Sequence, residues 1–148
     1  MKALVQRVSE ALLTVDGQQI SHIGYGLVCY LGVGAGDTVK ELEWLARKVA
    51  GLRIFNDENG KMNLSLNDVD GEILVVSQFT LFGDIKNGYR PGFSAAEKPE
   101  IAREFYEIFC DKLAEHQIKK VARGIFAADM HIAQTNIGPV TIMLDTKA

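Results

Sequence analysis

The sequence predicts one α/β domain over residues 1–148, built from a mostly antiparallel sheet and two main helices. Three observations indicate this class. The chain of 148 residues has about the length of one domain, and its 47% apolar and 24% charged content is that of a globular protein. Strand-like segments are numerous and are joined by turn residues. Only two long segments have apolar residues at helical spacing.

The N-terminal half is expected to hold most of the strands and the first helix. Asp16-Gly17 is a hairpin signal, because glycine supplies the positive φ that a primed turn needs. Thr38 and Glu41 form a possible capping box at the start of a helix. Its apolar stripe consists of Val39, Leu42, Leu45, Ala46, Val49 and Leu52. The strands expected in this half are Ala3–Val8, Ala11–Val15, Ile20–Ile23, Leu27–Val33 and Arg53–Phe55.

The C-terminal half is expected to hold a long strand, a loop, the second helix and two last strands. Gly83–Pro99 contains three Gly and two Pro, which predicts a loop or lid. The second helix is predicted from Pro99 to His116, since proline suits a first helical turn. Its apolar stripe consists of Ile101, Phe105, Ile108, Phe109 and Leu113. The expected strands are Glu72–Phe82, Met130–Thr135 and Val140–Leu144, the last two separated by Asn136–Pro139.

Composition and charge exclude several classes of protein. The longest apolar runs, Leu27–Leu31 and Ile73–Val76, are far shorter than the roughly 18 residues that span a bilayer. With no signal-peptide pattern either, we expect a cytoplasmic protein without a membrane partner. Sixteen basic and 19 acidic residues give a net charge of −3, which argues against DNA or bulk nucleic acid but allows contact with one end of an RNA. Cys29 and Cys110 are expected to be buried free thiols.

The common catalytic patterns are missing from the chain. Gly32–Asp37 follows a strand, but its spacing does not match a dinucleotide-binding loop, so a plain turn is expected. The three histidines have no partner four residues away, as a helical metal site requires, and no serine stands in a nucleophile elbow. No metal or cofactor is therefore expected.

Two stretches are harder to explain as ordinary structure. Ser77-Gln78-Phe79-Thr80-Leu81 ends the most apolar strand with polar side chains, which either form a capping network or line a pocket. Backbone N–H groups at such a strand end can act as oxyanion donors. Asn136-Ile137-Gly138-Pro139-Val140-Thr141 is either an ordinary turn or a place where backbone carbonyls approach a ligand, because glycine has no Cβ.

Together these stretches resemble the two defining motifs of the D-aminoacyl-tRNA deacylases. The likeness extends in the family's order from Met1 to about Leu144. It includes the opening Met-Lys-Ala-Leu-Val-Gln-Arg-Val, Ile-Phe-Asn-Asp-Glu-Asn-Gly-Lys-Met-Asn, Gly-Tyr-Arg-Pro and Phe-Ala-Ala-Asp-Met. The resemblance implies a small homodimer with a barrel-like sheet. It also implies hydrolysis of the ester that joins a D-amino acid, or misattached glycine, to the 3′ acceptor end of tRNA.

The resemblance also implies roles for particular residues. Ser77, Gln78, Phe79 and Thr80 carry over to the catalytic pocket. Thr80 is a candidate nucleophile without an obvious base, and the terminal 2′-hydroxyl of the tRNA is the alternative that fits better. Gly138 and Pro139 carry over to a cis-peptide motif that enters the partner subunit's site and rejects L-aminoacyl groups by steric clash. The supporting residues are Arg7, Asn136, Met130 and Thr141.

Some positions leave alternatives open. Arg7 holds the Gly-Pro loop through backbone carbonyls or is a surface strand residue. Ile137 stands where the family typically has Asp, and Gly92 where Ser is common, which leaves open how the two loops are fixed. Lys86, Arg90, Lys119, Lys120 and Arg123 are candidates for phosphate contacts or an ordinary solvated surface. The alternative function is an inactive dimeric module of the same fold that binds an RNA end or a small ligand.

Overall fold

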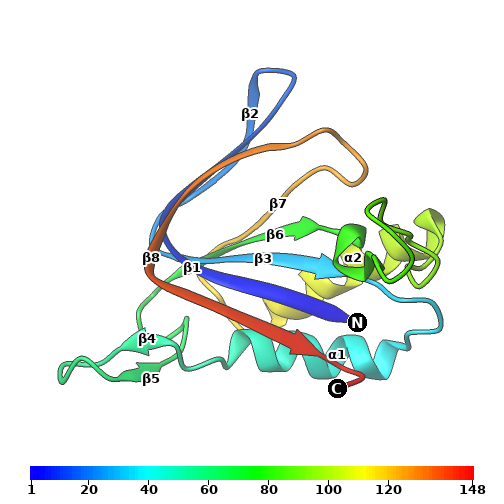
Figure 1. Ribbon diagram of the computed structural model, residues 1–148. Coiled ribbons are helices and arrows are strands. Elements are labelled where there is room, and N and C mark those ends of the chain that lie inside the picture. Colours follow the sequence, from blue (N-terminus) through cyan, green and yellow to red (C-terminus); the bar gives the residue numbers. More distant parts are fainter.

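The computed structural model describes residues 1–148 and shows one α/β domain with two helices (Figure 1). The strands are β1 (Lys2–Val15), β2 (Gln18–Ile23), β3 (Gly26–Gly32), β4 (Phe55–Asn56), β5 (Met62–Leu64), β6 (Glu72–Ser77), β7 (Val121–Arg123) and β8 (His131–Asp145). The helices are α1 (Val39–Ala50) and α2 (Pro99–Glu115), with a 3-10 turn η1 (Phe79–Phe82). Neither α-helix combines the length and the apolar composition needed to cross a membrane.

The main sheet is mixed and curls into an almost closed barrel. Its order is β2-β1-β3-β6-β7, and β8 pairs with the remaining edge of β1. β1 is antiparallel to β2, β3 and β8, whereas β6 is parallel to both β3 and β7. The expectation of a mostly antiparallel, barrel-like sheet is therefore confirmed, with two parallel pairings added. β4 and β5 form a separate small hairpin.

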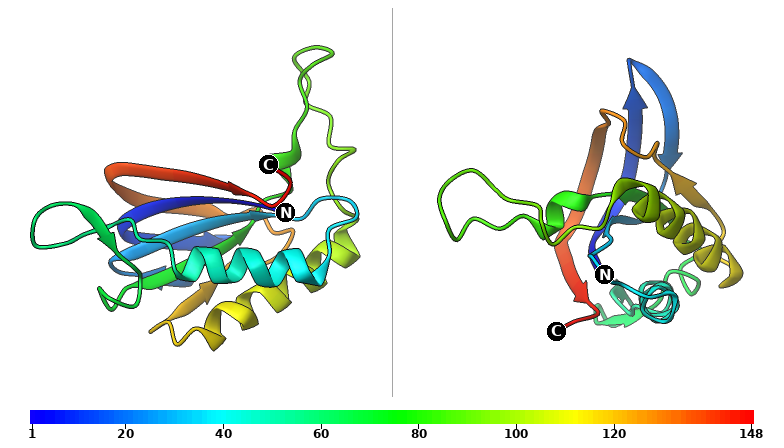
Figure 2. Two further views of the ribbon diagram at one scale, coloured as in Figure 1. Left: turned by 90° about the horizontal axis from the view of Figure 1, so that it is seen from below. Right: turned by 90° about the vertical axis from the view of Figure 1, so that its right-hand side faces the viewer.

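Hydrophobic residues pack on both faces of this sheet. The larger core lies between the sheet and the helices α1 and α2, which cover one face (Figure 2). The smaller core fills the inside of the curl and includes Val8, Leu13 and Val76. Cys29 and Cys110 are buried free thiols, as expected, and burial raises the pKa of Cys110 to about 12.

Helix α1 begins as its local sequence predicts. The Thr38 side chain accepts a hydrogen bond from the Glu41 N–H, and the Glu41 carboxylate accepts one from the Thr38 N–H at 2.8 Å. Lys147 also donates to Glu41, and these hydrogen bonds lower the pKa of Glu41 to about 2. The capping box is therefore also a link between α1 and the C-terminal segment.

Four predicted strand boundaries were wrong, and a further strand, β7, was missed. β1 is one strand rather than two, β8 runs through Asn136–Pro139, and the small strand begins at Phe55. The expected strand Glu72–Phe82 ends at Ser77, and η1 follows it. β7 pairs with β6 only as far as Val75, and β3 pairs with β6 only as far as Ser77. The residues after Ser77 therefore have no strand to pair with. The predicted alternation of side chains past Ser77 therefore does not hold.

The pairing between β1 and β8 is interrupted at one place. Gln6 pairs with Thr141 and Val8 pairs with Asn136, so a single residue of β1 stands opposite four residues of β8. Those four residues, Ile137–Val140, loop out of the ladder. The residue opposite them is Arg7, which lies in the same interval of β1.

Candidate active site

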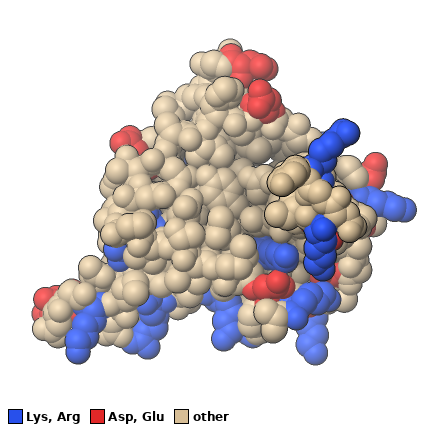
Figure 3. All heavy atoms as spheres, viewed as in Figure 1, with Lys and Arg blue, Asp and Glu red and all other residues tan.

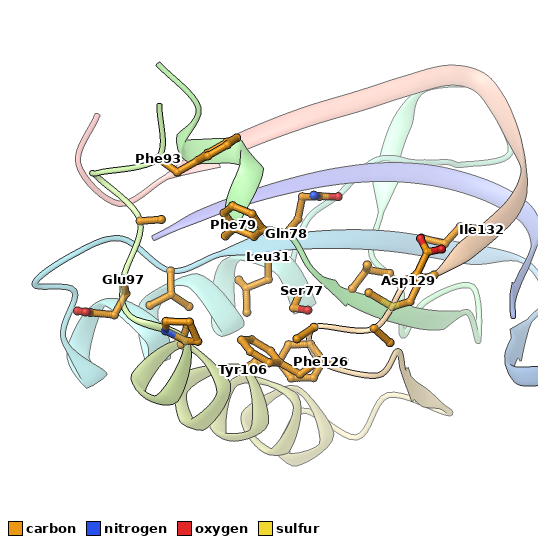
Figure 4. Close-up of a pocket in the computed structure, with 18 residues that line it drawn as sticks. Leu31, Ser77, Gln78, Phe79, Phe93, Glu97, Tyr106, Phe126, Asp129 and Ile132 are labelled. Carbon is orange, nitrogen blue, oxygen red and sulfur yellow. The ribbon is translucent and has the colours of Figure 1, made fainter. Parts of the chain in front are cut away.

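A cavity of about 620 Å³ lies at the end of β6 (Figure 4). Ser77, Gln78 and Phe79 form one side of it, and Met130 and Phe126 lie on another. Figure 4 shows Ser77 projecting from the strand end toward Phe126, whereas Gln78 points the other way. Most of the lining is apolar, and the volume lies in the range of about 300–1,000 Å³ that is usual for small-molecule sites.

Tyr106 of α2 fixes the two segments that meet at this cavity. Its ring is buried, and its hydroxyl donates to the Val75 carbonyl at 2.8 Å and accepts from the Gly124 N–H at 3.1 Å. The Gly124 N–H also reaches the Val75 carbonyl at 3.1 Å. These bonds hold the end of β6 beside the segment that leads to Phe126. Burial raises the pKa of Tyr106, so its hydroxyl stays protonated and keeps donating.

The start of η1 supplies free backbone donors beside Ser77. The backbone leaves the extended conformation at Gln78, which has φ −146° and ψ 79°. The first N–H of the turn that bonds to a carbonyl before it is that of Leu81, which donates to the Gln78 carbonyl. The first N–H groups of a helix have no carbonyl partner within it. Phe79 and Thr80 occupy those positions, so their N–H groups are available at the junction of the strand and the turn.

The cavity contains few ionisable groups. Glu97 and Asp129 are the only carboxylates in its lining, and no histidine takes part. Backbone N–H groups of Lys98 and Gly36 donate to Glu97 and lower its pKa, so this carboxylate is ionised and committed to holding its loop. No group of His, Cys, Asp and Glu side chains is arranged to hold a metal ion.

Thr80 lies on the other side of the motif from Ser77. It lines a separate hollow of about 320 Å³ together with Gln78, Tyr30 and Gln6. The Gln78 side-chain amide donates a hydrogen bond to the Thr80 hydroxyl. No acidic or histidine side chain lines this hollow. A general base for Thr80 is therefore not found among the residues around it.

The exposed face of β1, β3 and β8 carries a hydrogen-bonded polar network next to that hollow. The Tyr30 hydroxyl donates to Gln134 at 2.7 Å, and the Gln134 amide donates to Gln6 at 2.9 Å and to Asn136 at 2.6 Å. A longer contact of 3.4 Å joins Gln6 to Thr141. Asn136 and Thr141, predicted as supporting residues, thus belong to the sheet surface and not to the cavity.

Arg7 holds the Gly-Pro loop, as one of the two predicted alternatives proposed. Its side chain is only 5% exposed and donates to the carbonyls of Ile54 at 2.8 Å and Ile137 at 3.4 Å. A further contact of 3.3 Å reaches the Asn56 side chain. The alternative of a surface strand residue is wrong. The guanidinium joins the β4–β5 hairpin to the loop.

The Gly138-Pro139 peptide bond is cis and lies exposed at the surface of the chain. Gly138 has φ +116°, and a Cβ there would lie 2.9 Å from Val140 Cγ2 and 3.0 Å from Arg7 Nη2. Glycine is therefore required by both the backbone conformation and the space. The loop does not line the cavity at Ser77 within the same chain.

The structure thus divides the predicted residues among four places. Ser77, Gln78, Phe79 and Met130 meet at the cavity, and Thr80 faces the second hollow. Arg7 lies under the Gly-Pro loop, and Asn136 and Thr141 lie on the sheet surface. Sequence reasoning missed three aromatic residues of the cavity wall: Phe93, Tyr106 and Phe126. They come from three separate segments, and no local pattern connects them. Phe93 lies in the loop predicted as a lid, Tyr106 lies on the second helix outside its predicted apolar stripe, and Phe126 opens the Phe-Ala-Ala-Asp-Met stretch that contributed to the family resemblance.

Comparison with known proteins finds relatives over almost the whole chain. A family model described as D-Tyr-tRNA(Tyr) deacylase matches residues 4–145. D-aminoacyl-tRNA deacylases of Magnetococcus marinus and Thermotoga petrophila are 54% and 52% identical over 145 and 146 residues, covering 98% and 99% of this chain and 96% and 97% of theirs.

Solved structures share the fold. The c-Myc DNA Unwinding Element Binding Protein has a TM-score of 0.91 at 44% identity, with 98% of both chains covered. A probable eukaryotic D-amino acid tRNA deacylase has a TM-score of 0.84 with 97% of both chains covered, and at 15% identity it is similar in fold alone. With the family match over almost its whole length and relatives above half identity, this chain belongs to the D-Tyr-tRNA(Tyr) deacylase family.

Proposed function

We propose that this chain is a cytoplasmic hydrolase that cleaves the ester of D-aminoacyl-tRNA and of mischarged glycyl-tRNA. The observation that carries the proposal is the apolar cavity at the end of β6, with the Ser77 side chain and the first N–H groups of η1 at its edge. Such a cavity can hold the terminal nucleoside while free N–H groups stabilise the negative charge that develops on the ester carbonyl.

The chemistry is addition of water to the ester carbonyl followed by loss of the 3′-oxygen. Water forms the new C–O bond, the bond to the ribose 3′-oxygen breaks, and the departing oxygen takes up a proton. Free D-amino acid and tRNA are the products. The 2′-hydroxyl of the terminal ribose assists these proton transfers, because Thr80 has no base beside it. Ser77 and the Phe79 N–H orient the ester.

We further propose that the active unit is a homodimer in which each Gly138-Pro139 loop completes the partner's cavity. The loop is exposed and is absent from its own cavity. From Ile132 to Leu144, β8 contains no charged residue although alternate side chains are exposed. The middle of the face in Figure 3 is accordingly almost free of charged atoms. An uncharged exposed sheet surface is suited to association with a second copy.

Chiral selection then follows from a rigid rim of backbone. Arg7 beneath the loop donates to the Ile137 carbonyl and limits the loop's movement. Carbonyls at the rim leave no space for an L side chain but admit a D side chain or the hydrogen of glycine. A steric clash of this kind discriminates against the wrong substrate without any gain of affinity for the right one.

Hydrolysis of D-tyrosyl-tRNA and L-tyrosyl-tRNA at equal enzyme concentration tests the activity. We expect fast release from the D substrate, negligible release from the L substrate, and no effect of EDTA. Hydrolysis of neither ester would support the inactive RNA-end-binding module instead, and Ile137→Asp would then be the first variant to assay.

Mixing two inactive variants tests whether the loop acts across the dimer. Ser77→Phe fills the cavity, and Gly138→Val distorts the loop. A mixed dimer has one cavity and one loop intact, on opposite protomers. D-specific activity should therefore reappear on mixing if the loop acts in the partner, whereas a site within one chain would stay inactive.

A further inference from the structure

The loop after η1 stands away from the body of the protein as a hairpin (Figure 2). The two sides of this hairpin are joined by reciprocal backbone hydrogen bonds between Asp84 and Gly92, each 2.8 Å long. The Asp84 side chain also accepts from the Lys86 N–H at 2.9 Å. Every residue from Gly83 to Gly92 is exposed, and this segment is called the arm below. The arm is therefore ordered by its own hydrogen bonds and not by packing.

The tip of the arm presents an aromatic ring to solvent. Tyr89 is 104% exposed, as much as a tyrosine in an extended chain, and Ile85 is 69% exposed. The other aromatic rings near the cavity are in contact with neighbours, as with Phe79 and Phe93 at a centroid distance of 4.9 Å. The Tyr89 ring contributes nothing to the packing of its own chain. The stability of the fold therefore does not explain why an aromatic residue stands at this position.

Two unpaired cations flank this ring. Lys86 and Arg90 form no ion pair, in contrast to Lys119 and Arg123, two of the other basic residues predicted to contact phosphate. Arg123 lies 2.6 Å from Glu107 and 2.7 Å from Asp111, and Lys119 lies 3.6 Å from Asp70. The arm thus carries two positive charges that no carboxylate of this chain neutralises, although the chain as a whole carries −3.

The arm is anchored directly to the cavity wall. Phe93 follows it by one residue and lines the cavity. Phe93 lies four positions after Tyr89, a span of at most about 14 Å. A stacked strand rises about 3.4 Å per nucleotide, so that reach corresponds to about four nucleotides. A terminal nucleoside held in the cavity therefore has its preceding unpaired nucleotides within reach of the tip.

We propose that the arm binds the unpaired 3′ end of the tRNA, with Tyr89 stacked on a base and Lys86 and Arg90 against the phosphates. The proposal rests on the proposed function, because it takes the terminal nucleoside to lie in the cavity. Exposed aromatic rings beside cations bind single-stranded nucleic acid without a requirement for a particular base. Tyrosine and arginine also occur often at protein interfaces, but lysine is depleted there, so the three side chains together fit a nucleic acid better.

The test compares a whole substrate with one that cannot reach the arm. The substrates are D-tyrosyl-tRNA and the D-tyrosyl ester of adenosine, and the variants are Tyr89→Ala and Tyr89→Phe. Tyr89→Ala should raise the KM for the tRNA ester by about 5- to 100-fold and leave the adenosine ester unaffected. Tyr89→Phe keeps the ring and should behave as the unmodified protein.

Charge removal gives an independent measurement. Replacing Lys86 and Arg90 by Ala should lower the slope of log KM against log salt for the tRNA ester by about 0.7 for each phosphate that the variant no longer neutralises. Lys40→Ala on α1, another exposed lysine without an ion pair, is the matched control and should leave the slope unchanged.

The outcomes separate failure of this proposal from failure of the proposed function. Unmodified protein that hydrolyses neither ester would contradict the deacylase activity itself. Active protein in which Tyr89→Ala impairs both esters equally, or neither, would overturn the arm as an RNA contact. A Tyr89→Ala protein that sediments as a monomer, while the unmodified one is a dimer, would assign the arm to the interface between copies and also overturn it.

Discussion

Replacing Arg7 by Met tests the claim that its guanidinium holds the Gly-Pro loop. Methionine keeps most of the volume but removes all three hydrogen-bond contacts. Only the 2.8 Å bond to Ile54 is short, and a hydrogen bond from a charged group contributes about 1.5–3 kcal/mol. We expect the free energy of unfolding to fall by about 2–3 kcal/mol. The melting temperature should fall by roughly 4–12 °C.

Urea unfolding followed by circular dichroism measures the loss, with Arg53→Met as the control. Arg53 is exposed and also donates to a backbone carbonyl, that of Asn63, so its replacement should cost less than about 0.5 kcal/mol. Below the unfolding range, Arg7→Met should still hydrolyse D-tyrosyl-tRNA but should discriminate less against the L ester. Equal stabilities of the two variants, or unchanged discrimination by Arg7→Met, would refute the reasoning.

Three further changes have expected outcomes of their own. Gly138→Ala should lose about 1–3 kcal/mol of stability together with D-over-L selectivity, whereas Gly60→Ala, where a Cβ meets nothing within 4 Å, should keep its selectivity in the same assay. Tyr106→Phe should lower the melting temperature by only about 2–4 °C, because the Gly124 N–H retains its bond to the Val75 carbonyl; a change of more than three times that size would contradict this. The pKa of Glu41 is lowered on folding to about 2, so its stabilisation is complete above about pH 4.5 and is lost as the pH falls toward 2. Glu41→Gln should therefore show a smaller drop in melting temperature between pH 6 and pH 3, and an unchanged drop would show that this carboxylate is not responsible.

The elements that the sequence predicts well are those with local causes. The capping box of Thr38 and Glu41 and the turn at Asp16-Gly17 depend on residues within a few positions of each other. The end of β6 has no such cause. It is set by where β3 and β7 stop, and the sequence from 72 to 82 contains no mark of either.

The site shows the same division. Its motif residues could be named from the sequence, but their separation into a cavity at Ser77 and a hollow at Thr80 depends on the 3-10 turn. For Arg7 a signal was present. Ala3 and Val5 share its face of the strand by alternation, and both are fully buried, which indicates that Arg7 points inward too. The aromatic wall could not have been assembled without the tertiary fold.

The pairing of β1 with β8 has a consequence for how this chain is made. Residues 2–14 leave the ribosome long before their partners at 131–145, so one entire edge of β1 stays unpaired while the segment between them is made. Unpaired edges invite pairing with other chains. Closure of the barrel therefore waits until β8 has been made. A chain that stops short of β8 has an open edge, is prone to aggregation, and lacks the Gly-Pro loop proposed above to distinguish D from L.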